Sequence, residues 1–179
     1  MTKDSTNPAD KTGQSQPVSL SDAVDGTIAG EFTTDDPLDK VVLYAFDQAR
    51  QKLEEGGIVE PFTILVKGEN LYIESHPGED AVECFNSARK TVFEMEQASD
   101  AYVFCYDGYV DLDEGTRDAL VVERARKDDD LGEAFAILYT EDEDDEEGGI
   151  EFEDSIYDLG EASSLYKEEP FTPEDLEEL

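Results

Sequence analysis

Three apolar runs alternate with acidic turns in the segment AYVFCYDGYVDLDEGTRDALVVERARKDDDLGEAFAILYT, residues 101–140. The turns contain Asp113-Glu114-Gly115 and Asp128-Asp129-Asp130. Short runs of aromatic and β-branched residues between such turns are typical of antiparallel strands joined by hairpins. Residues 101–106 are apolar at every position, which indicates a central strand covered on both sides. The segment therefore predicts three consecutive strands.

Two helices and a hairpin are expected upstream. The first helix begins at Pro37, with Asp35 or Asp36 as its cap, and ends at Gly56-Gly57. Its apolar stripe has spacings of three and four residues: Leu38, Val42, Ala45, Ala49 and Leu53. The hairpin joins strands at residues 62–66 and 71–73, and a second amphipathic helix spans residues 79–97.

The resulting fold class is α+β. We expect a mainly antiparallel sheet of five or six strands with two helices, in the order α-β-β-α-β-β-β, followed by an edge strand at residues 150–157. The pattern leaves open whether the helices share one face of the sheet. Residues 35–157 form the single domain. Residues 1–34 are expected to be a disordered polar tail, and residues 158–179 an acidic tail with a short helix near its end.

Charge is the dominant compositional feature. The chain has 179 residues, 48 of them acidic and 13 basic, for a net charge of −35. Residues 141–179 alone hold 18 acidic residues and one basic residue. Such a field repels phosphate and anionic lipid, so we expect neither direct nucleic-acid binding nor membrane binding. A basic protein is the partner that this charge favours.

Catalytic and redox motifs are absent from the sequence. The single histidine, His76, precedes a Pro-Gly turn, and the two cysteines, Cys84 and Cys105, fall within apolar patterns that indicate buried thiols. No Ser elbow, phosphate-binding glycine loop, dinucleotide fingerprint or zinc motif is present. We therefore expect a binding protein rather than an enzyme, and no cofactor. The buried thiols and the lack of a secretory signal predict a reducing, cytoplasmic location.

The acidic run near residue 145 resembles a calcium-binding loop. Residues 143–154 approximate a twelve-residue loop, with oxygen ligands at Glu143, Asp145, Glu147 and Asp154. The loop departs from the pattern because its first ligand is Glu, its last is Asp, and its flanks are predicted strands. Weak, nonspecific cation binding by the acidic run explains the same residues.

Four basic residues interrupt the acidic trend. Arg117, Arg124, Arg126 and Lys127 lie on one predicted strand or at its end. We expect them to neutralise neighbouring carboxylates such as Asp118. A small anion-binding patch is the alternative interpretation.

The leading functional hypothesis is a non-enzymatic binding or regulatory protein that acts on a basic partner. The residues predicted to contact that partner are Glu143, Asp144, Asp145, Glu146, Glu147, Phe171 and Leu176. The alternative is a small-molecule-binding domain or an enzyme whose pocket is not visible as a motif. Its candidate pocket residues are Tyr102, Tyr106 and Asp107 on the predicted central strand.

Overall fold

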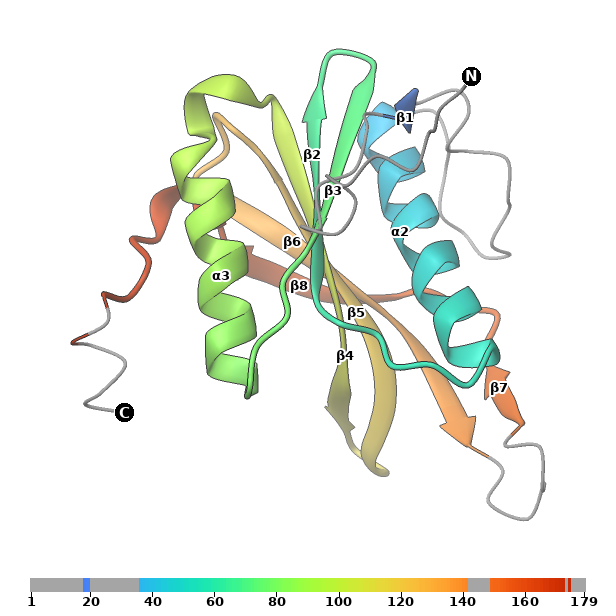
Figure 1. Ribbon diagram of the computed structural model, residues 1–179. Coiled ribbons are helices and arrows are strands. Elements are labelled where there is room, and N and C mark those ends of the chain that lie inside the picture. Colours follow the sequence, from blue (N-terminus) through green and yellow to red (C-terminus); the bar gives the residue numbers. More distant parts are fainter. Residues whose placement is uncertain (1–17, 20–35, 142–148, 173, 175–179) are drawn as a thin grey trace, which may run out of the picture.

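The computed structural model describes residues 18–19, 36–141, 149–172 and 174. Within these ranges, two helices and an antiparallel sheet of eight strands form an α+β domain, which confirms the predicted class (Figure 1). The helices are α2 (Pro37–Glu54) and α3 (Ala81–Glu94). The strands are β1 (Val18–Ser19), β2 (Phe62–Lys67), β3 (Asn70–Ser75), β4 (Ala101–Leu112), β5 (Gly115–Arg126), β6 (Leu131–Glu141), β7 (Ile150–Phe152) and β8 (Tyr157–Ser163).

The sheet order follows from short hairpin connections. Its strands run β1-β3-β2-β4-β5-β6-β7, and β8 also pairs with β6. The longest ladder joins β4 to β5, from the pair Ala101–Arg126 to the pair Leu112–Gly115. Gly115 closes this hairpin with a φ of 124°, a conformation that residues with a β-carbon rarely adopt. The acidic turn predicted at this position is confirmed.

Both helices are capped by aspartates, as short polar side chains before a helix predict. Asp36 accepts a hydrogen bond from the Leu38 amide at 2.9 Å, and Pro37 takes the first helical position. Asp80 caps α3 in the same way by accepting from the Glu83 amide at 2.9 Å. Because Asp80 is the cap, α3 begins two residues later than predicted. A 3₁₀ turn, η2 (Glu96–Ala98), follows it.

One helix lies on each face of the sheet, which answers the question that the sequence left open (Figure 1). On one face, α2 packs against Ile64, Val103 and Leu120. On the opposite face, Ala88 and Val92 of α3 pack with Leu65, Tyr102 and Phe104. Adjacent residues of β2 and β4 therefore serve two different cores, because side chains alternate along a strand. This explains why residues 101–106 are apolar throughout.

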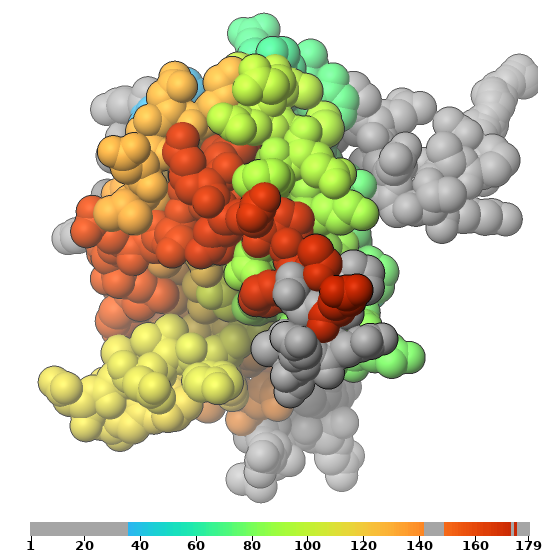
Figure 2. All heavy atoms as spheres, turned by 90° about the vertical axis from the view of Figure 1, so that its left-hand side faces the viewer, coloured from blue at the N-terminus to red at the C-terminus, as the bar shows by residue number. Residues whose placement is uncertain are grey.

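The folded domain continues past residue 157, where the sequence predicted an acidic tail. Strand β8 pairs with β6 from Ala136 back to Leu131, and a 3₁₀ turn, η3 (Leu165–Lys167), then buries Leu165 and Tyr166 beside α3. Figure 2 shows this segment lying against α3. The expected edge strand at residues 150–157 is divided into β7 and the start of β8. These additional edge strands, with β1, account for the difference between eight strands and the expected five or six.

Neither of the two helices is both long and apolar enough to cross a membrane; this finding covers the described ranges only.

Candidate functional site

The three predicted pocket residues lie on β4 but do not share one environment. Tyr102 is fully buried, and its hydroxyl accepts a hydrogen bond from the Leu165 amide at 2.9 Å. Tyr106 points to the same face as Tyr102, while Asp107 points to the opposite face. The three residues therefore do not line a common pocket. Tyr102 instead attaches the C-terminal η3 turn to the sheet.

Tyr106 belongs to a partly buried aromatic cluster and is hydrogen-bonded to a carboxylate. Its ring centroid lies 4.8 Å from that of Phe85 and 5.1 Å from that of Phe104. Its hydroxyl donates a hydrogen bond of 2.8 Å to Glu123. Burial raises the pKa of Glu123, and the nearby Glu168 adds to this increase while the Tyr106 hydrogen bond opposes it. No sequence motif predicted this carboxyl, because it lies within an apolar strand.

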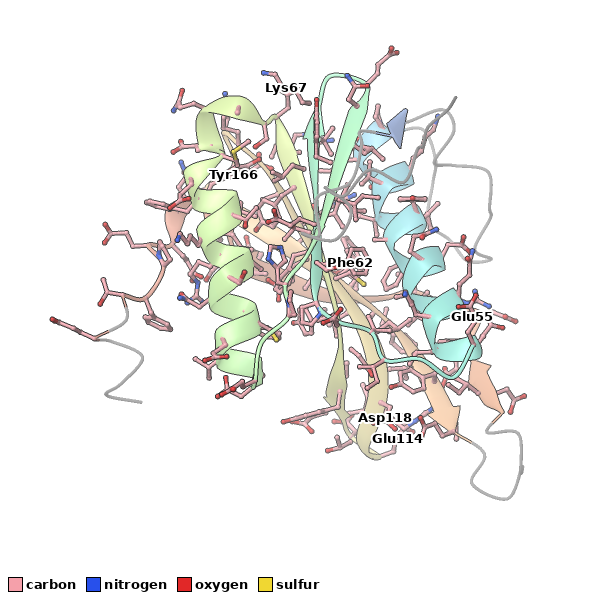
Figure 3. All side chains as sticks on the ribbon, in the orientation of Figure 1. Glu55, Phe62, Lys67, Glu114, Asp118 and Tyr166 are labelled. Atoms are coloured by element: carbon pink, nitrogen blue, oxygen red, sulfur yellow. The ribbon has the colours of Figure 1, made fainter. Side chains whose placement is uncertain are left out.

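Asp107 contributes to an acidic surface formed by three strands. It accepts a hydrogen bond of 2.6 Å from the Tyr139 hydroxyl. Partial burial raises the pKa of Asp107, the Tyr139 hydrogen bond opposes this increase, and the charges of Asp118 and Glu141 add to it. We call Asp107, Asp118 and Glu141 the acidic strand face; they come from β4, β5 and β6, and Figure 3 labels Asp118 near the end of the β4–β5 hairpin.

The acidic strand face also carries an exposed aromatic ring. Tyr109 lies two residues after Asp107, on the same side of β4, and is 70% exposed. A ring beside carboxylates is a surface suited to guanidinium or ammonium groups. Among the described residues, no three His, Cys, Asp or Glu side chains are grouped so that they could hold a metal ion.

The basic residues of β5 are paired with carboxylates distant in sequence. Arg124 forms ion pairs with Asp39 of α2 and with Glu133, and Arg126 pairs with Asp36 at 2.6 Å. Arg117 contacts Glu153 at 2.9 Å. The expectation that this group neutralises carboxylates is supported for these three arginines, but the partners are not the sequence neighbours. These ion pairs attach α2 and residue 153 to the sheet. Asp118 takes part in none of them.

Most of the residues predicted to contact a partner lie outside the described part of the chain. These are Glu143, Asp144, Asp145, Glu146, Glu147 and Leu176. Three of the four predicted calcium ligands, Glu143, Asp145 and Glu147, are among them. The fourth, Asp154, follows β7. Phe171 is described and lies against α3. Its amide donates to Asn86 Oδ1 at 2.7 Å, its carbonyl accepts from Asn86 Nδ2 at 3.1 Å, and its ring lies 5.0 Å from the Arg89 guanidinium.

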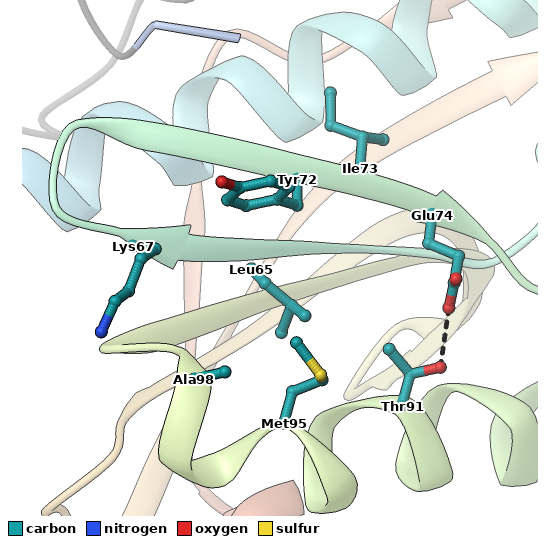
Figure 4. Close-up of a pocket in the computed structure, with 8 residues that line it drawn as sticks. All are labelled: Leu65, Lys67, Tyr72, Ile73, Glu74, Thr91, Met95 and Ala98. Carbon is teal, nitrogen blue, oxygen red and sulfur yellow. Dashed lines mark hydrogen bonds between the residues drawn. The ribbon is translucent and has the colours of Figure 1, made fainter. Parts of the chain in front are cut away.

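A groove with a volume of about 550 Å³ lies between the β2–β3 hairpin and α3 (Figure 4). We call it groove A. Leu65, Tyr72 and Met95 form much of its wall, and Lys67 lies at its rim. Glu74 accepts a hydrogen bond of 2.7 Å from Thr91, which connects β3 to α3. The alternative hypothesis of a pocket without a sequence motif has a candidate location here, because this volume is in the range of small-molecule sites.

A smaller groove of about 150 Å³, groove B, lies on the other side of β3, next to α2. Its walls include Lys52, Ile58 and Ser75. Ile73 contributes to both grooves, since it lies on the outermost long strand of the sheet. The sequence could not reveal either groove, because each combines residues of a helix with residues of β2 and β3.

The single histidine, His76, lies between two hydroxyl groups. His76 is buried, and its ring nitrogens are 2.8 Å from Thr63 Oγ1 and 3.0 Å from Ser87 Oγ. Burial lowers its pKa, which favours the neutral ring. Cys84 and Cys105 are buried, free thiols, as predicted, and burial raises the pKa of both. A neutral imidazole between two hydroxyl groups connects β2, β3 and α3, and neither thiol is activated.

Comparison with known proteins found no similar protein. The chain matches no family model, no curated protein and no solved structure.

Proposed function

We propose that this chain is a non-enzymatic binding or regulatory protein that contacts a basic protein partner through the acidic strand face. The observation that carries the proposal is that Asp107, Asp118 and Glu141 lie on the same face of three adjacent strands, where like charges crowd. The pKa of Asp107 is raised by its partial burial and by the two neighbouring carboxylates. Such crowding is unfavourable in the free protein, and an approaching lysine or arginine would relieve it.

The surrounding charge supports the same conclusion. The three described arginines of β5 pair with Asp36, Asp39, Glu133 and Glu153, which leaves the charge of the acidic strand face available to a partner. In sequence, Glu141 is followed directly by six more acidic residues. A field of this sign accelerates association with a basic protein and excludes acidic competitors. The exposed ring of Tyr109 would add a cation–π contact.

The test is affinity capture from a lysate of the source organism at low and moderate salt, using the full chain. One variant combines Asp107→Asn, Asp118→Asn and Glu141→Gln; Asn at position 107 still accepts the Tyr139 hydrogen bond. The matched control combines Asp128→Asn, Asp130→Asn and Glu161→Gln, three exposed carboxylates on other parts of the surface. Both variants lose three charges, so a difference between them depends on location.

We expect a basic protein to be retained by the wild type and by the control, and to be released by salt. The variant of the acidic strand face should bind it about tenfold less tightly or worse. Equal retention by the two variants, or retention of no basic protein, would contradict the proposal. Substitutions are preferable to removal of residues 141–179, because that truncation would also remove β8 and the buried η3 turn.

A further inference from the structure

The outer edge of β3 has an incomplete strand partner. Strand β2 pairs with β3 along its whole length, but β1 pairs only with Asn70 and Leu71. No other described strand is paired with this edge. In contrast, the outer edge of β6 is covered by β7 at one end and by β8 at the other. An exposed strand edge is a template for another extended chain.

The register identifies which backbone groups point outward. His76 donates a backbone hydrogen bond of 2.7 Å to the Pro61 carbonyl, so residues 61 and 76 form a hydrogen-bonded pair. Such pairs alternate with non-hydrogen-bonded pairs in an antiparallel ladder. The pairs Ile64–Ile73 and Phe62–Ser75 are therefore of the second kind. The N–H and C=O groups of Ile73 and Ser75 consequently point away from β2, toward the side of β3 where no described strand pairs with them.

The two grooves flank this same edge. Groove A lies on the α3 side of β3 and groove B on the α2 side, and Ile73 contributes to both. Successive side chains of an added strand would point alternately to the two sides. Each groove carries one exposed apolar side chain: Ile58 in groove B is 84% exposed, and Tyr72 in groove A is 41% exposed.

We propose that residues 72–75 accept an extended segment of a partner protein as an added β-strand. The segment would place bulky apolar side chains in groove A and smaller aliphatic ones in groove B, because the volumes are about 550 and 150 Å³. Backbone hydrogen bonds to Ile73 and Ser75 would give affinity, and the two grooves would give specificity. Each groove holds one lysine and one glutamate, so the contact depends on apolar burial more than on charge.

A protein segment fits this surface better than the other occupants. A small molecule in groove A would leave the outward backbone groups and groove B unused. The residues that precede Val18 in sequence, Gln14-Ser15-Gln16-Pro17, include no bulky apolar side chain, and a proline has no N–H to donate. A second copy of this chain would bring together two charges of −35.

The test selects peptides from a displayed library of random octapeptides on the immobilised full chain. The best peptide is then synthesised, and its dissociation constant is measured by fluorescence anisotropy. Ser75→Pro removes the outward N–H without breaking a backbone hydrogen bond to β2, since the residue 75 amide points away from β2; proline is tolerated at such edge positions. Ser75→Ala is the matched control, because it removes the same side chain and keeps the N–H.

We expect the selected peptides to carry bulky apolar residues at every second position, with aliphatic residues between them. Ser75→Pro should weaken binding about tenfold, and Ser75→Ala less than about twofold. Ile58→Glu should also weaken binding, because it places a charge in groove B. Since position 58 is 84% exposed, this second variant tests the same contact without introducing a proline into β3. The variant of the acidic strand face should bind the peptide normally, so failure here is distinct from failure of the proposed function.

Three results would overturn the inference: a library from which no peptide is enriched, a selected peptide that binds the Ser75→Pro and Ile58→Glu variants as tightly as the wild type, or a peptide without the alternating pattern.

Discussion

At the scale of single residues, Glu123 is the clearest case of a charge held in an unfavourable place. It lies within an apolar strand, accepts a hydrogen bond from Tyr106, and has a pKa raised chiefly by burial. Between its ordinary and raised pKa values, the folded chain binds a proton that the unfolded chain has released. The contribution of Glu123 to stability therefore falls as the pH rises through this interval.

Glu123→Gln should remove this penalty, because its amide oxygen still accepts from Tyr106. We expect urea denaturation at pH 8 to show a variant with a higher free energy of unfolding than the wild type. The advantage should shrink as the pH is lowered toward 5. Glu161→Gln, an exposed control on β8, should show no such dependence. A Glu123→Gln variant that is less stable than the wild type at pH 8 would show that the ionised carboxylate is favourable.

Features that depend on a few adjacent residues could be predicted from the sequence. The aspartate cap and proline start of α2, and the buried free thiols, could be predicted from a few adjacent residues. The pocket prediction failed to find one site because Tyr106 and Asp107, although adjacent, serve opposite faces. The ion pair between Arg124 and Asp39 was equally inaccessible, since 85 positions separate the two residues.

At the scale of secondary structure, the C-terminal elements mark the limit of prediction. Strand β8 is mostly exposed and lacks an alternating apolar pattern, so its sequence resembles a polar tail. Only pairing with β6 makes it a strand. The strands β4 to β6 were predictable because their apolar runs and turn residues agree with each other. Grooves A and B required knowledge of how helices and strands pack, which no single segment encodes.

Tyr166→Ala tests whether the η3 turn is part of the core. Tyr166 is buried, and its hydroxyl is 2.7 Å from Ser99 Oγ. We expect chemical denaturation to show a loss of about 3–5 kcal/mol, as for other large buried side chains. Phe171→Ala is the control, because Phe171 is 41% exposed and should cost less than about 1 kcal/mol. Equal and small effects for the two variants would indicate that the domain ends before η3.

At the scale of the whole molecule, two surfaces of different chemistry lie in different parts of the sheet. Figure 3 labels Asp118 and Glu114 near one end of the β4–β5 hairpin, and Lys67 at the tip of the β2–β3 hairpin. The acidic strand face suits long-range attraction of a basic protein, and the β3 edge suits short-range binding of an extended segment. The sequence predicted the sign of the field, but the positions of these surfaces depend on the fold.

The most direct test of the central claim is the salt dependence of binding. The dissociation constant of the captured basic partner would be measured by titration over a range of salt concentrations. We expect affinity for the wild type to fall steeply with salt, because exposed charges are screened within about 8–10 Å at physiological ionic strength. The variant lacking the charges of Asp107, Asp118 and Glu141 should give a shallower dependence and weaker binding at low salt, and the matched control should retain most of the wild-type slope. The same slope for both variants would contradict the assignment of the contact to the acidic strand face.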